Sequence, residues 1–173
     1  MTGDEELLLA VANTDHGHHD EFADAASVRA WWLALGRPAT SQAVEGVEML
    51  RALRVLIRGL ALRNNGVEPD LSRATGLEAL GLRLDLAGAP SLRAGEGGDL
   101  AHEIAAATVT ALLREMARPG WARVKACRGD DCRWVFVDGS RNSSRRWCAM
   151  AGCGNRAKVA TFRDRHRREV STS

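Results

Sequence analysis

The stretch Cys127-Arg-Gly-Asp-Asp-Cys132, followed after fifteen residues by Cys148-Ala-Met-Ala-Gly-Cys153, contains all four cysteines of the 173-residue chain. Two cysteines a few residues apart let one tight turn supply two ligands, and the intervening segment can bring the second pair alongside the first. Zn²⁺ prefers such a set of four soft ligands in a tetrahedron. The spacing therefore predicts one structural Zn²⁺ ion held by Cys127, Cys132, Cys148 and Cys153.

The alternative use of four cysteines is a pair of disulfides, which are typical of secreted proteins. The chain begins Met-Thr-Gly-Asp-Glu-Glu, which is acidic where a secretory signal would be basic. Its apolar runs are also much shorter than the roughly 20 residues that span a bilayer. We therefore expect a cytoplasmic protein with reduced thiols and no membrane partner.

Charge divides the chain into two parts. Residues 121–173 hold 13 Lys/Arg and 5 Asp/Glu, a balance of +8, whereas the first 120 residues hold the other 11 and 17, a balance of −6. We predict an acidic domain over residues 1–120 and a basic zinc module over residues 121–173.

The first 120 residues show mainly helical patterns. Ser27 is a candidate N-cap for a helix that ends at Gly36, apolar residues recur at three- and four-residue steps from Ser41 to Asn64, and Asp99 is a candidate N-cap for a helix to Arg118. Leucines alternate with charged residues from position 82 to 86, which favours a short strand or hairpin. The expected fold class is mainly α: a helical N-terminal domain with short strands, followed by a small zinc finger.

Within the finger, Arg133–Asp138 is rich in branched and aromatic residues and Arg145–Trp147 returns after a turn, so we predict a hairpin between the two cysteine pairs. Trp134, Phe136 and Trp147 are its expected core. A helix should follow from Arg156, with Val159, Phe162, His166 and Val170 packed on the hairpin. A hairpin and a helix joined by two cysteine pairs resemble a treble-clef zinc finger, and metal binding should supply on the order of 10 kcal/mol of its folding free energy.

The basic residues of the finger form a candidate nucleic-acid surface. The candidate contacts are Arg141, Arg145, Arg146, Arg156, Lys158, Arg163 and Arg167. The same charges could instead form a solvated face that neutralises the four thiolates, which with Zn²⁺ add −2. Zinc modules of this size also serve as protein-interaction or purely structural units.

These residues carry a family resemblance. The run from Cys127 to Lys158, with the tetrad Cys153-Gly154-Asn155-Arg156, resembles the bacterial CGNR zinc finger over about residues 124–168. The resemblance assigns the zinc ligands to the four cysteines and matches the pattern Phe-x-Asp-x-Ser at Phe136, Asp138 and Ser140. We expect Asp138 and Asn155 to fix the turn and the start of the helix.

In that family the finger follows a helical ABATE domain, described as a stress-induced transcription regulator. The body here is similar in length and has Asn13-Thr14 after an apolar run and Trp32-Leu33 in a helix that ends at glycine. The resemblance implies a DNA-binding transcription regulator whose helical domain senses an effector or forms a homodimer. The alternative is a protein-interaction or small-ligand-binding protein in which zinc is purely structural.

An enzyme is the third class. His16, His18 and His19 lie among Asp15, Asp20 and Glu21 and could bind a second metal. The chain has no Gly-rich phosphate loop, no recognisable Ser-His-Asp set and no fifth cysteine as a nucleophile. Because four thiolates leave zinc no open position for a substrate, we expect no enzymatic activity.

Overall fold

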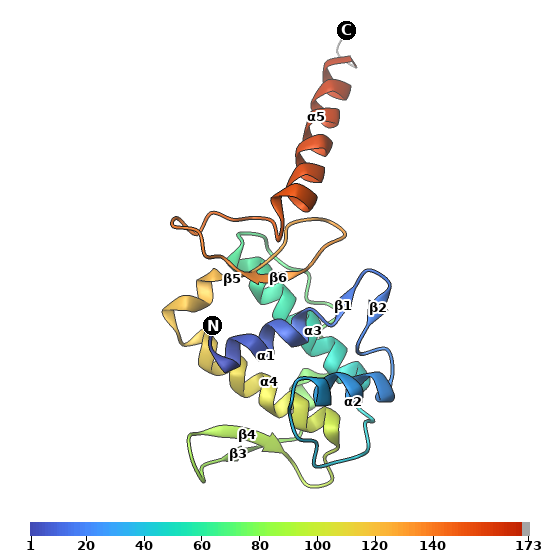
Figure 1. The fold of residues 1–173 in the computed structure, drawn as a ribbon, viewed down its shortest axis with the longest axis vertical. Coiled ribbons are helices and arrows are strands. Elements are labelled where there is room, and N and C mark those ends of the chain that lie inside the picture. The colour runs from blue at the N-terminus through green and yellow to red at the C-terminus, as the bar shows by residue number, and fades with distance from the viewer. Residues whose placement is uncertain (171–173) are drawn as a thin grey trace.

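The computed structural model describes residues 1–170, and its body is a bundle of helices (Figure 1). The expected fold class holds in its coarse form, because five α-helices are accompanied by three two-stranded antiparallel sheets. The long helices α3 and α4 pack together with α1, and α2 covers one end. The helices are α1 (Gly3–Ala12), α2 (Ala25–Ala34), α3 (Val47–Asn64), α4 (Leu100–Met116) and α5 (Asn155–Val170). The strands are β1 (Asp15–His16), β2 (His19–Asp20), β3 (Leu82–Asp85), β4 (Ser91–Ala94), β5 (Val124–Ala126) and β6 (Val135–Val137).

Helix starts follow the capping side chains. Asp99 caps α4 as expected, accepting a hydrogen bond from the His102 backbone at 3.1 Å. The N-cap predicted for α2 was wrong by three residues. Asp24 caps the helix, and its side chain accepts a hydrogen bond from the backbone N–H of Ser27 at 2.8 Å.

Helix α3 begins at Val47, six residues later than the apolar pattern predicts. The segment before it is extended because α4 provides its hydrogen-bond partners. The Glu103 carboxylate accepts from the backbone of Thr40 at 3.1 Å and of Ser41 at 2.9 Å, and Leu100 donates its backbone N–H to Ala43 at 3.0 Å. Tertiary contacts thus override local helix propensity here.

The β3–β4 hairpin confirms the alternating leucine pattern. It lies beside α4, where the Leu92 backbone N–H donates to Thr110 Oγ1 at 2.8 Å. Strand β3 is the outer strand and lies at the end of the molecule opposite α5 (Figure 1).

The hairpin of the zinc module differs from the predicted one. Strand β6 pairs with β5, which precedes the first cysteine pair, and residues 145–147 form no strand. The backbone of Arg146 instead accepts hydrogen bonds from the Arg128 backbone at 3.1 Å and the Asn65 side chain at 3.0 Å. The first cysteine pair therefore lies in the loop of the β5–β6 hairpin.

The hydrophobic core of the body continues into this hairpin. Val124, Ala126 and Val135 are buried in the same cluster as the residues of α1, α3 and α4. Two of the three aromatic residues expected in the finger core are there, since Phe136 is buried and Trp147 is partly buried, but Trp134 is 40% exposed and meets His16 edge-on at 5.8 Å.

Helix α5 projects away from the rest of the molecule (Figure 1). It does not pack on the hairpin as predicted, because Val159 is 48% and Phe162 71% exposed. The expected packing of His166 and Val170 falls on side chains outside the described part of the structure, as do residues 171–173 of the predicted second domain.

Candidate metal centre

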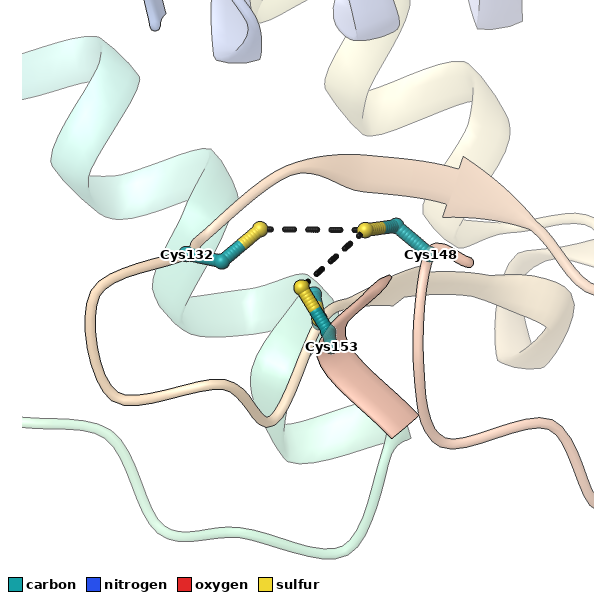
Figure 2. A group of neighbouring side chains, drawn as sticks. Cys132, Cys148 and Cys153 are labelled. Atoms are coloured by element: carbon teal, nitrogen blue, oxygen red, sulfur yellow. Dashed lines mark hydrogen bonds between the residues drawn. The ribbon is translucent and has the colours of Figure 1, made fainter. Parts of the chain in front are cut away.

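The four cysteine side chains converge on one point. Their sulfur atoms lie within 4.8 Å of one another, with Cys127 and Cys153 buried and the other two partly buried. Figure 2 shows the sulfur of Cys148 facing those of Cys132 and Cys153, at 3.7 Å from each. In the part of the chain that the structure describes, this is the one group of three or more His, Cys, Asp or Glu side chains close enough to hold a metal ion.

The spacing of the sulfurs fits zinc. Bonds of about 2.3 Å from Zn²⁺ to each thiolate of a tetrahedron separate neighbouring sulfurs by about 3.8 Å. Burial and the adjacent thiols raise the pKa of Cys148 far above its usual value, whereas backbone hydrogen bonds, one from Gly129 at 3.5 Å, outweigh burial and lower the pKa of Cys127. Four such thiolates need a cation to stay ionised together, and the site therefore binds one structural zinc ion.

The turn after the second cysteine pair is shaped by three residues that follow Cys153. A Cβ on Gly154 would lie 2.5 Å from the Met150 sulfur and 3.2 Å from Cδ1 of Trp147, so a larger residue would have to displace the Met150 side chain. The Asn155 side chain donates to the Ala151 carbonyl at 3.2 Å and holds the π-helical turn of Met150–Gly154 against the start of α5. Arg156 donates to the Cys153 sulfur at 3.0 Å, which places a positive charge on a ligand. Each residue of this tetrad thus supports the metal site.

Residues 123–166 match the CGNR zinc finger. The matched segment begins just before β5 and includes all four cysteines and most of α5. It contains none of the body, so the ABATE domain remains a prediction. A search of curated proteins finds no match to the chain.

The motif Phe136-x-Asp138-x-Ser140 forms a buried hydrogen-bond centre beside the metal site. Asp138 is fully buried and accepts four bonds, from Lys125 Nζ at 2.8 Å, the Ser140 hydroxyl at 2.6 Å and the backbones of Ser140 and Arg145 at 2.9 Å. Burial alone would raise the pKa of Asp138, but these donors lower it well below its usual range. The Asp138 carboxylate fixes the loop between the two cysteine pairs.

Three asparagines attach the finger to the body. Asn13 binds both backbone groups of Val135, at 2.8 and 2.9 Å, as a neighbouring strand would. Asn64 donates to the carbonyls of Trp121 and Val124, and Asn65 to that of Ala126 at 2.7 Å as well as to Arg146. The sequence analysis missed this role, although Asn64-Asn65 at the end of a helix was the visible signal. The finger is therefore held rigidly on the ends of α1 and α3.

The predicted nucleic-acid residues are all exposed but fall into two groups. Two of them make contacts inside the finger. Arg156 donates a hydrogen bond to the Cys153 sulfur. Arg145 lies 4.7 Å over the Phe136 ring and donates to the carbonyls of Trp147 and Cys148. Arg167 also has an interaction of its own. Within the described residues, the side chains of the remaining four have no hydrogen bond or ion pair: Arg141, Arg146, Lys158 and Arg163.

The histidine-rich stretch folds into the β1–β2 hairpin, in which His16 faces His19. Its two aspartates pair with arginines of α3, Asp20 with the buried Arg54 and Asp15 with Arg58 at 3.2 Å. Glu21 lies 3.0 Å from His19. Together with His18, these histidines make no metal-binding group among the described residues.

Proposed function

We propose that the protein is a DNA-binding regulator that docks through the finger and α5. The observation that carries this proposal is the projection of α5, which starts at the last zinc ligand and extends away from the acidic body (Figure 1). The helix holds six Lys/Arg and two Asp/Glu in sequence. A solvated helix of this kind is free to approach the phosphates of a duplex.

The positive charges on α5 are arranged on two sides of the helix, as binding in the major groove of DNA would require. Arg156, Arg163 and Arg167 are seven and four residues apart and share one side of the helix, whereas Lys158 lies on the opposite side. An α-helix fits the major groove, which is about 12 Å wide, and cations on both flanks then meet the two phosphate backbones. Arg141 and Arg146 extend the positive surface onto the loop at the base of the helix.

The test is the salt dependence of affinity for duplex DNA, measured with the zinc-loaded full-length protein. The slope of log K against log salt falls by about 0.9 for each phosphate contact removed. Lys158→Ala combined with Arg163→Ala should therefore weaken binding and reduce the slope by roughly 2. These two side chains are preferable to Arg145 and Arg156, whose loss would also disturb the finger.

Arg93→Ala provides the matched control. Arg93 is an exposed arginine on β4, at the far end of the molecule from α5, so its removal should leave the affinity and the slope unchanged. Affinity that is independent of salt, or equal losses in the control and the double variant, would contradict the proposal.

Zinc bound by four thiolates has no open position for a substrate, so we propose that its role is structural and that the protein has no enzymatic activity. The thiolates require a reducing compartment, which favours the cytoplasm. Among the described residues no helix is long and apolar enough to cross a membrane. The body corresponds to an ABATE-like domain that reports an effector to the finger.

A second candidate is small-ligand binding by the body, favoured by a cavity of about 480 Å³ beside α3. Four arginines line it, and the burial of Arg58 together with the charge of Arg54 lowers the pKa of Arg58. Asp15 and Glu48 also line the cavity, and Arg51, Arg54 and Arg58 pair with Glu48, Asp20 and Asp15. An anion would therefore bind chiefly to the fourth arginine, Arg73. The arginines are Arg51, Arg54, Arg58 and Arg73.

Arg73 is the residue with which to test the cavity, because it is exposed and, within the described residues, has no hydrogen bond or ion pair. Inorganic phosphate should raise the melting temperature of the protein, and Arg73→Ala should reduce that rise. A rise of equal size in the variant would place the anion elsewhere.

A further inference from the structure

We propose that the outer edge of β3 is a homodimer interface, in which the β3 strands of two copies pair antiparallel around a twofold axis at Leu84. This inference is independent of nucleic-acid binding. Within the described residues β3 pairs with β4 alone, so its other edge is open. Exposed strand edges of this kind are templates for pairing with another chain.

The open edge of β3 carries backbone N–H and C=O groups that β4 does not bind. Gly95 donates its backbone N–H to the Gly81 carbonyl at 3.0 Å, so the backbone groups of Gly81 face β4. Alternation along β3 then directs the backbone groups of Leu82 and Leu84 toward the open edge, and Leu86 follows the last residue of the strand. Strand β4 is consistent with this orientation. Leu92 lies opposite Leu84, and its backbone N–H points away from β3 and donates to Thr110. Leu84 can therefore exchange both backbone hydrogen bonds with Leu84 of a second copy.

The side chains are complementary in this register. When Leu84 lies opposite itself, Leu82 lies opposite Leu86 of the second copy and Arg83 lies opposite its Asp85. Leu84 and Leu86 are 62% and 68% exposed, and pairing would cover them on one face. A shift by one residue to either side would place Arg83 opposite Arg83 or Asp85 opposite Asp85. Charge thus selects one register, and the twofold symmetry forms each favourable pair twice.

The charged side chains remain available for pairing. Arg83 has an ion pair with Glu96 at 3.0 Å, but both are at least half exposed, so that pair contributes little. Asp85 uses one oxygen to accept the Ala87 backbone at 2.9 Å. In the dimer the two α5 helices would lie at opposite ends, because β3 and α5 occupy opposite ends of each copy (Figure 1).

Charge reversal provides the test, with the dimer dissociation constant of the full-length protein measured by sedimentation. Arg83→Asp or Asp85→Arg alone replaces two attractive pairs with two repulsive ones and should weaken the dimer by about 10- to 100-fold. An equimolar mixture of the two single variants should form a heterodimer, because R83D in one chain meets D85R in the other. The double variant R83D/D85R should dimerise like the wild type.

Arg93→Asp is the matched control, since Arg93 lies directly opposite Arg83 on β4 but away from the open edge. This variant should keep the wild-type dissociation constant. A wild-type protein that stays monomeric at all concentrations would overturn the proposal. So would a dimer that R83D and R93D weaken equally, or single variants that do not associate when mixed while their melting temperatures show that they are folded.

Discussion

Replacing Asp138 with asparagine should destabilise the whole protein, although the change removes no atom from the core. The carboxylate is fully buried and accepts four hydrogen bonds, one of them from Lys125, which is itself only 4% exposed. An amide of the same size keeps one acceptor oxygen and places an N–H₂ group against donors. Lys125 then stays buried without its counter-charge.

The magnitude follows from that unpaired lysine. Breaking a buried ion pair by removing one partner costs about 3–5 kcal/mol of unfolding free energy. The loss should be global, because β5 and β6 share the core of the body. It should be measured by urea denaturation at neutral pH with zinc present, and Asp131→Asn, the same change at an exposed position of the finger, should cost less than about 0.5 kcal/mol.

The difference should also depend on pH. Because folding lowers the pKa of Asp138, its contribution is fully present above the unfolded value of about 4 and is lost as pH falls toward the folded value. The stability gap between wild type and D138N should therefore narrow in acid. A gap below about 1 kcal/mol at neutral pH, or one equal to that of D131N, would refute the role of the buried pair.

Three further variants test the support of the finger. Asn13→Ala removes both hydrogen bonds to the Val135 backbone and should lower the unfolding free energy by about 1–3 kcal/mol. His18→Ala, at an exposed position nearby, is the control. An equal loss in that control would show that the Asn13 amide is not responsible. Gly154→Ala should destabilise the zinc-loaded finger by about 1 kcal/mol, because its Cβ would displace the Met150 side chain and press on Trp147. Gly152→Ala, with open space around it, should cost less, and equal melting temperatures for the two variants would contradict this. Arg156→Gln should weaken zinc affinity by about 10-fold in a chelator competition, because a donor to Cys153 is lost, and unchanged affinity would show that this contact does not support the metal.

The sequence was most informative where chemistry is tied to spacing. The cysteine pattern predicted the metal site because a tetrahedral ion restricts the spacing of its ligands. Asp99 and the alternating leucines of β3 likewise act through local geometry. These features could be predicted because each depends on residues close together in the chain.

Long-range partners were the part that could not be predicted. The sequence paired the strand at Val135 with residues 145–147, whereas the structure pairs it with Val124–Ala126, because Asn65 and Arg128 bind the Arg146 carbonyl. Helix α3 begins six residues late because of contacts with α4. In both cases the competing partner lies far away in sequence, beyond the reach of periodicity or propensity. Val159 and Phe162 of α5 stayed exposed, although their spacing predicted packing on the hairpin.

The metal content of the purified protein tests the central claim most directly. Elemental analysis of protein prepared under reducing conditions should find one zinc ion per chain. Cys148→Ser, which removes the ligand between Cys132 and Cys153, should lower that content and expose Trp147, which packs beside the cysteines, to solvent. A wild-type protein without zinc, or a C148S variant that retains it at full stoichiometry, would contradict a site built from these four cysteines.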